Sequence, residues 1–219
     1  MSEKDIVVKQ IANIARGFYK YDNLINKANN KNYKDGKIGE LIKFDKDNYY
    51  KTFNDLISSN NYHILLNDDS LIHFYYEFDL EGNIIKHCLY YIPSPTENIM
   101  LFYQDNPSLI NDLIRNDIIV DIIELLKKYV RIDYDLEGKK EFVHTSVHMH
   151  LGIESDYLRF PLYSKVYPEE FIYFILKYIY NSDDEGLEKL DLSAYKKIEL
   201  SNEELKRFYI NNKLDSNTC

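Results

Sequence analysis

Cysteine is scarce in this 219-residue chain, which contains only Cys88 and Cys219. Two such cysteines provide neither a disulfide framework nor the paired spacing of a structural zinc site, and they are typical of free thiols in a reducing compartment. Long apolar runs are absent too, since no segment reaches the roughly 20 residues that a membrane-spanning helix needs. These absences predict a cytoplasmic protein without membrane contact.

The chain also lacks a basic surplus, because its 36 Asp and Glu residues outnumber its 27 Lys and Arg residues. A bulk acidic surface disfavours broad electrostatic capture of DNA, but it is compatible with a local basic pocket. Walker A, dinucleotide-binding and nucleophile-elbow motifs are missing as well. Their absence disfavours ATP hydrolysis, NAD chemistry and α/β-hydrolase chemistry.

No stretch rich in Pro, Gly or Ser divides the chain, and 45% of its residues are hydrophobic. We therefore expect residues 1–219 to form a single domain with a sizeable core. Its parts would be a helical region (1–60), a sheet with an inserted helix (61–165) and C-terminal helices (166–219). The fold class expected is α+β, with a central antiparallel sheet built from two hairpins and packed by N-terminal, middle and C-terminal helices.

Apolar residues spaced three and four apart over residues 7–25 predict an opening amphipathic helix. The polar stretch 29–39 would follow it, and a second helix is expected over residues 47–58. Pro and capping residues predict the remaining helices, at 107–129, 169–180 and from Ser201.

Strand periodicity begins at Tyr62. A tight turn at Glu81-Gly82 and a second tip at Glu137-Gly138 predict the two hairpins. The strands expected are residues 62–66, 71–79, 84–92, 98–104 and 157–162, together with the two arms around Glu137-Gly138.

Alternation along the second hairpin separates apolar from polar side chains. The core face would carry Val130, Ile132, Tyr134, Val143, Thr145, Val147, Met149 and Leu151. The opposite face would carry Arg131, Asp133, Asp135, His144, Ser146, His148 and His150, and thus three of the chain's six histidines.

This polar face has the residue types of a proton-transfer site. Histidine titrates near neutral pH, a carboxylate such as Asp133 can orient an imidazole, and an arginine such as Arg131 can hold a phosphate. Alternate strand positions put the Cα atoms of His148 and His150 roughly 7 Å apart, so a divalent metal at these two histidines is a cofactor to consider. The candidate catalytic residues are Asp133, His144, His148 and His150.

Other interpretations of these histidines stay open. His148-x-His150-x-x-x-Glu154 is similar to a cupin metal motif, but its glycine and the second cupin motif are missing. Two-histidine phosphodiesterases need two copies of a motif that only His144-Thr145-Ser146 matches here. The face would otherwise be solvated, covered with hydrogen-bonded core histidines, or a ligand pocket without catalysis.

Four short pieces of the C-terminal half occur in a fixed order. They are Arg131-Ile132-Asp133, His148-Met149-His150-Leu151-Gly152, Arg159-Phe160-Pro161 and Pro168-Glu169-Glu170-Phe171. This series resembles the signature of a bacterial family, domain of unknown function 2290. The resemblance implies no activity, but it adds Arg159 to Arg131 as a candidate substrate-binding residue.

The leading hypothesis is a phosphodiester-cleaving enzyme, a nuclease or toxin-like effector that acts on a nucleic acid or nucleotide. His148 or His144 would transfer protons, Asp133 would orient the imidazole, and Arg131 and Arg159 would stabilise phosphate charge. The look of the family, rather than any chemistry, suggests a defence or conflict system. The alternative is a non-enzymatic regulatory module whose acidic surface, in a chain with 21 tyrosines, docks a protein partner.

Overall fold

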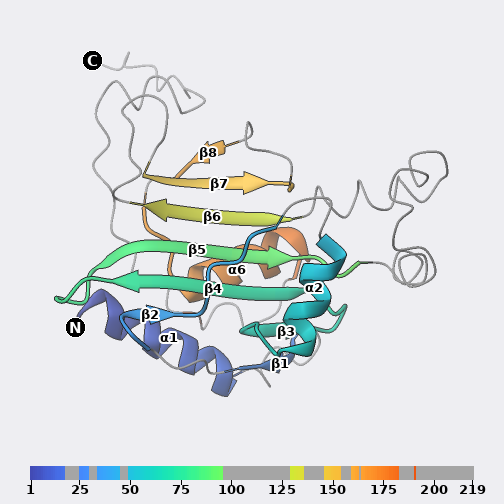
Figure 1. Cartoon of the computed structure of the whole chain (residues 1–219), viewed down its shortest axis with the longest axis horizontal. Helices are drawn as coiled ribbons and strands as arrows, with labels where there is room; N and C mark the ends of the chain where they lie inside the picture. The colour runs from blue at the N-terminus through green and yellow to red at the C-terminus, as the bar shows by residue number, and fades with distance from the viewer. Residues whose placement is uncertain are drawn as a thin grey trace, which may run out of the picture.

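A single antiparallel sheet organises the computed structural model, which describes residues 1–17, 25–29, 34–44, 49–95, 129–135, 146–153, 159–162, 164–182 and 190. In these ranges the sheet has eight strands, in the order β1-β3-β4-β5-β6-β7-β8 with β2 also paired to β4 (Figure 1). Their bounds are β1 Ile25–Ala28, β2 Lys37–Ile38, β3 Ile64–Leu66, β4 Leu71–Phe78, β5 Ile84–Ile92, β6 Val130–Asp135, β7 Val147–Leu151 and β8 Arg159–Pro161. With its helices, the chain has the α+β fold that its sequence predicts.

The first helix, α1 (Glu3–Gly17), is shorter than the apolar spacing predicts. It begins with a reciprocal cap, in which Asp5 N–H donates to Ser2 Oγ and Ser2 N–H donates to Asp5 Oδ2. The predicted extension to Ile25 is wrong, because Ile25 lies in β1 and pairs with Leu66 of β3. A buried β-branched residue fits a strand as well as an apolar helix face, so spacing alone could not separate the two.

The other helices follow the predicted boundaries closely. They are α2 (Tyr49–Ser58) and α6 (Pro168–Phe174), which continues as the π-helix η2 (Ile175–Ile179). After α2, Asn60 adopts a φ of 55°, and Asn61 N–H donates to the Leu56 carbonyl. This is the left-handed ending that asparagine tolerates at a helix C-terminus.

The β4–β5 hairpin forms at the predicted turn. Gly82 has a φ of 84°, and Asp79 Oδ1 accepts hydrogen bonds from the backbone of Glu81 and Asn83. The turn thus combines a left-handed glycine with an aspartate that bonds its own loop.

The two faces of the sheet bury different cores. Figure 1 shows α6 behind the sheet and α2 in front of it. One core joins α1, α6 and η2 to alternate sheet residues, among them Phe74, Leu89 and Ile132. The other core joins α2 to the opposite alternates, including Tyr75, Cys88 and Tyr90. The candidate site lies on this second face.

Three predicted elements lie outside the described residues: the strand 98–104, the helix 107–129 apart from its last residue, and the helix from Ser201. Tyr129, the predicted end of the second of these, is described and is not helical. The predicted polar connection 29–39 proves to contain β2, which is too short to show an alternating pattern. In the part of the chain that the structure describes, no helix combines the length and apolar character needed to cross a bilayer.

Candidate functional site

The pairing of β6 with β7 sets Asp133 opposite His148 and Arg131 opposite His150. Directly opposite residues of an antiparallel pair project to the same face, so four of the predicted site residues come together. The predicted tip at Glu137-Gly138 lies outside the described residues. The observed register differs from the one that a two-residue turn there would give, in which Asp133 lies opposite residue 142. The difference of six residues is even, and the same side chains therefore share a face.

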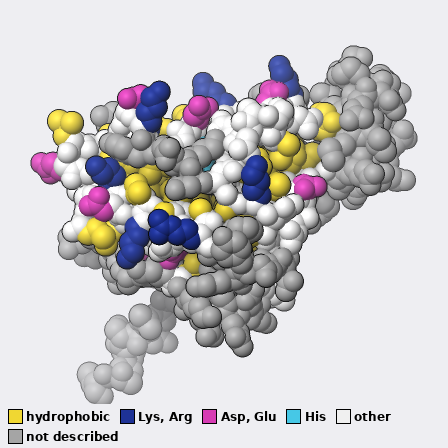
Figure 2. All heavy atoms as spheres, turned by 90° about the horizontal axis from the view of Figure 1, so that it is seen from below, with side chains coloured by type: hydrophobic (Ala, Val, Ile, Leu, Met, Phe, Trp, Pro, Cys, Tyr) yellow, Lys and Arg dark blue, Asp and Glu magenta, His cyan; other side chains and the backbone are white. Residues whose placement is uncertain are grey.

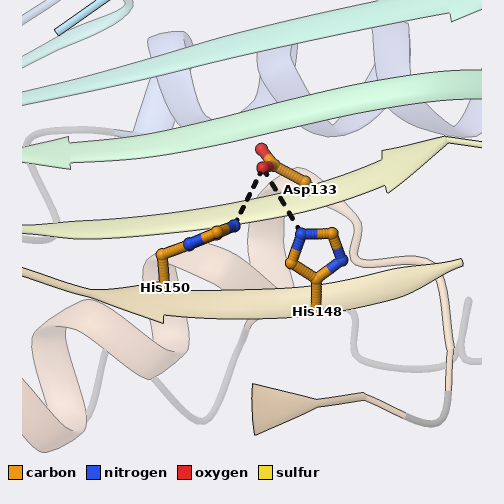
Figure 3. Close-up of side chains that lie close together, drawn as sticks. All are labelled: Asp133, His148 and His150. Carbon is orange, nitrogen blue, oxygen red and sulfur yellow. Dashed lines mark ion pairs between the residues drawn. The ribbon is translucent and has the colours of Figure 1, made fainter. Parts of the chain in front are cut away.

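One carboxylate oxygen lies at the centre of the contacts. Asp133 Oδ2 lies 3.2 Å from His150 Nε2 and 3.7 Å from His148 Nε2. The carboxylate points from β6 toward both imidazoles of β7 (Figure 3). Arg131 Nε donates to the same oxygen over 2.9 Å. A single atom thus meets two imidazoles and one guanidinium.

The Nε2 atom of His150 has two competing hydrogen-bond partners. His150 Nε2 lies 3.2 Å from Asp133 Oδ2 and 3.1 Å from Arg131 Nη2. A protonated Nε2 donates to the carboxylate, whereas an unprotonated Nε2 accepts from the guanidinium, and the atom cannot do both. Whether Nε2 carries a proton therefore decides whether His150 bonds to Asp133 or to Arg131.

Burial alone would raise the pKa of Asp133, because it disfavours the charged form. The hydrogen bond from His150 and the positive charge of Arg131 oppose burial and hold the pKa well below its usual range. Asp133 is consequently a carboxylate at neutral pH, as an orienting group must be.

The site residues line a cavity of about 470 Å³. Among the described residues that line it, the cations are Lys43, Lys86 and Arg131 and the carboxylates are Asp133 and Asp135. The cavity therefore has a positive excess when its histidines are neutral, although the chain carries a net charge of −9. On the face seen in Figure 2, Lys and Arg are instead interspersed with Asp and Glu.

One wall of the cavity is the segment 39–44, here called the strap, which crosses β4 and β5 in Figure 1. Gly39 begins the strap with a φ of 69°, and a Cβ there would lie 2.1 Å from the Phe74 carbonyl oxygen. His73 Nε2 lies 2.9 Å from the Glu40 carbonyl oxygen, and Tyr90 OH donates to the Ile42 carbonyl. These contacts hold the strap against the sheet.

The histidines of the site are not solvated, because His148 and His150 are only 2% and 3% exposed. The interpretation of this face as the open side of the sheet is therefore wrong. His63, His73 and His87 are buried too, as packing residues would be. Burial lowers the pKa of His87 to about 3, which leaves its imidazole neutral.

Of the predicted site residues, two are described only in part or not at all, namely Arg159 and His144. His144 falls outside the described residues. Arg159 pairs with His150 through the backbone of β7 and β8, and its side chain is not described. The structure therefore brings Arg131, Asp133, His148 and His150 together and leaves these two aside.

Sequence reasoning missed Lys86 and the strap. Alternation from the Glu81-Gly82 turn puts Lys86 on one face with Cys88, but only the pairing of Cys88 with Asp133 brings that face to the site. Burial, and then the negative charge of Asp133, raise the pKa of the Cys88 thiol well above its usual range. Cys88 is thus a neutral neighbour of the site rather than a thiolate nucleophile.

Comparison with protein families matches residues 19–213 to a family model described as "Uncharacterized conserved protein (DUF2290)". Comparisons with curated proteins and with solved structures found no match. The matched span includes all four residues that meet in the site.

Proposed function

The chain belongs to the DUF2290 family of uncharacterized conserved proteins, and from the geometry of its own site we propose that it cleaves phosphodiester bonds. The observation that carries the proposal is the cavity, in which two buried imidazoles meet an ionised carboxylate beside three cationic side chains. A phosphodiester needs both kinds of group, because its charge must be stabilised while a proton moves.

His148 is the proton-transfer residue in this proposal. Its Nε2 lies 3.7 Å from Asp133 Oδ2, longer than a hydrogen bond, whereas His150 lies within reach of both Asp133 and Arg131. A water or ribose hydroxyl would attack phosphorus and lose its proton to His148. The P–O bond to the leaving oxygen would break, and that oxygen would take a proton from water in the cavity. Asp133 and His150 would orient the attacking water or hydroxyl.

Lys43, Lys86 and Arg131 are the described cations of the cavity that would neutralise the phosphate. Lys86 Nζ lies 2.8 Å from Asp135 Oδ2, and both residues line the cavity. Arg159 stays in the proposal as a further phosphate ligand, because its backbone pairs with that of His150.

Labelled RNA, DNA and cyclic nucleotides, each with and without Mn²⁺ or Zn²⁺, are the direct test. We expect turnover of at least one substrate and a loss of about 100-fold or more in H148Q, the usual contribution of general acid–base catalysis. The matched control is K27A, which removes a lysine on β1 away from the cavity. No turnover by the wild type, or equal turnover by H148Q, contradicts the proposal.

The family resemblance adds a setting to this proposal, that of a toxin-like effector in a defence or conflict system. Induced expression of the wild type should then arrest growth of a bacterial host, and expression of folded H148Q at the same level should not. Equal growth of the two cultures argues against an effector role.

A further inference from the structure

We propose that Asp133, His148 and His150 form a binding site for one divalent transition-metal ion of the zinc class. One candidate ligand atom from each residue lies within 4.8 Å of the other two. The catalytic role of such an ion rests on the proposed function: with the ion bound, His148 would be a ligand, and the ion would replace His148 as the group that activates the attacking water. Binding of the ion is measured without any substrate.

The spacing of the ligand atoms fits a tetrahedral ion. Ligands bound about 2.0–2.1 Å from zinc at tetrahedral angles are separated from one another by about 3.3 Å. Asp133 Oδ2 lies 3.2 Å from His150 Nε2 and 3.7 Å from His148 Nε2. The two imidazole nitrogens lie within 4.8 Å of each other, so binding an ion would draw them together by up to about 1.5 Å.

The donor set selects the class of metal. Two imidazoles and one carboxylate suit zinc and its first-row neighbours, whereas magnesium and calcium prefer sites built from oxygen alone. Three protein ligands also leave a fourth position open, as in catalytic rather than structural zinc sites. The residues face the 470 Å³ cavity, from which water or substrate can reach that position.

A second observation concerns the other carboxylate oxygen. Asp133 Oδ1 is buried and makes no hydrogen bond with the described residues. Buried carboxylate oxygens normally have a partner, since losing water without replacement is costly. A cation bound at Oδ2 would compensate part of the negative charge that the carboxylate places on this buried atom.

Arg131 contacts two of the same ligand atoms, and its guanidinium would have to move away before the ion could bind. Its Nε lies 2.9 Å from Asp133 Oδ2, and its Nη2 lies 3.1 Å from His150 Nε2. An ion bound to His150 Nε2 takes the lone pair that Nη2 contacts, so the guanidinium and the metal compete. Replacing Arg131 with a neutral residue should therefore tighten metal binding.

The test is calorimetric titration of chelator-treated full-length protein with Zn²⁺, and separately with Mg²⁺. We expect one equivalent of Zn²⁺ and no Mg²⁺ to bind. H148Q and H150Q should each weaken Zn²⁺ binding by about tenfold or more, since even outer-shell changes cost that much. R131Q should bind at least as tightly as the wild type, and D55N, which changes an exposed carboxylate, should bind equally.

If a variant fails to fold, an NMR measurement on the wild type tests the site instead. Zn²⁺ should shift the imidazole NMR signals of two histidines and leave those of the buried His63, His73 and His87 in place. No stoichiometric Zn²⁺, or a glutamine variant that binds as the wild type does, overturns the metal site. Turnover in chelator overturns the catalytic metal alone, whereas bound Zn²⁺ without turnover of any phosphodiester overturns the proposed function alone.

Discussion

Asp133 shows at the residue scale why a single carboxylate can organise the site. Its Oδ2 atom meets Arg131, His148 and His150, and its side chain is only 16% exposed. Removing one partner of a buried ion pair leaves the other charge without compensation. The contribution of Asp133 to stability should therefore exceed that of any exposed carboxylate.

D133N tests this expectation. The variant should lose about 2 kcal/mol of unfolding free energy, because Arg131, whose side chain is 29% exposed, stays partly buried without its counter-charge. D55N should change by less than about 0.5 kcal/mol, as exposed substitutions usually do. Urea denaturation of the wild type and both variants measures the difference, and equal losses would show that Asp133 contributes no special stability.

His87 provides a residue-scale prediction of pH dependence. Its pKa is lowered to about 3 in the folded state, so between that value and its ordinary pKa the unfolded chain binds more protons. The stability that depends on neutral His87 is thus complete above about pH 6.5 and is lost as pH falls, by up to about 1.4 kcal/mol per pH unit.

The comparison is with H87Q, whose amide can still accept the hydrogen bond that Val166 N–H donates to His87 Nε2. Unfolding free energies measured from pH 7 to 4 should fall more steeply for the wild type than for H87Q. Parallel curves would mean that His87 keeps an ordinary pKa in the folded protein.

At the scale of elements, the strap forms one wall of the cavity. Gly39 provides the backbone conformation with which the strap begins. Gly39 has a left-handed φ of 69°, and a Cβ would come 2.1 Å from the Phe74 carbonyl oxygen. G39A should cost about 1–2 kcal/mol for the left-handed backbone and a further 1–3 kcal/mol or so for the clash. It should also weaken the binding of any ligand in the cavity.

Gly82 is the matched control, because its φ is 84° but the nearest atoms to an added Cβ belong to the Ser2 side chain, 3.0 Å away. G82A should therefore cost only the backbone term, and ligand binding should stay unchanged. Thermal unfolding and a binding assay on both variants decide the matter; equal effects would show that the strap does not depend on Gly39.

At the scale of the whole molecule, charge predicts how a nucleic acid would bind. The chain has a net charge of −9, and the cavity lining offers three cations. Each neutralised phosphate of a single strand contributes about 0.7 to the salt slope. With Arg159 added to these three cations, the slope of log K against log salt should not exceed about 3 in magnitude. Anisotropy of a labelled oligonucleotide at several salt concentrations measures it, and a slope of about 5 would require a basic surface elsewhere.

The sequence alone determined the features that depend on neighbours along the chain. Strand alternation put Asp133, His148 and His150 on one face. The observed register differs from the predicted one by an even number of residues, so the assignment of these side chains to one face holds. Local turn chemistry likewise placed the hairpin at Glu81-Gly82, where glycine supplies the left-handed φ.

Only the tertiary structure decided which distant segments meet. The pairing of β5 with β6 brings Lys86 and Cys88 beside the site, and the strap closes the cavity from a segment about 90 residues earlier than Asp133. Ile25 joined β1 instead of the first helix for the same kind of reason, since its partner is Leu66. Residue spacing records the period of a local element, whereas burial and pairing depend on the free energy of contacts between segments that the linear pattern does not relate.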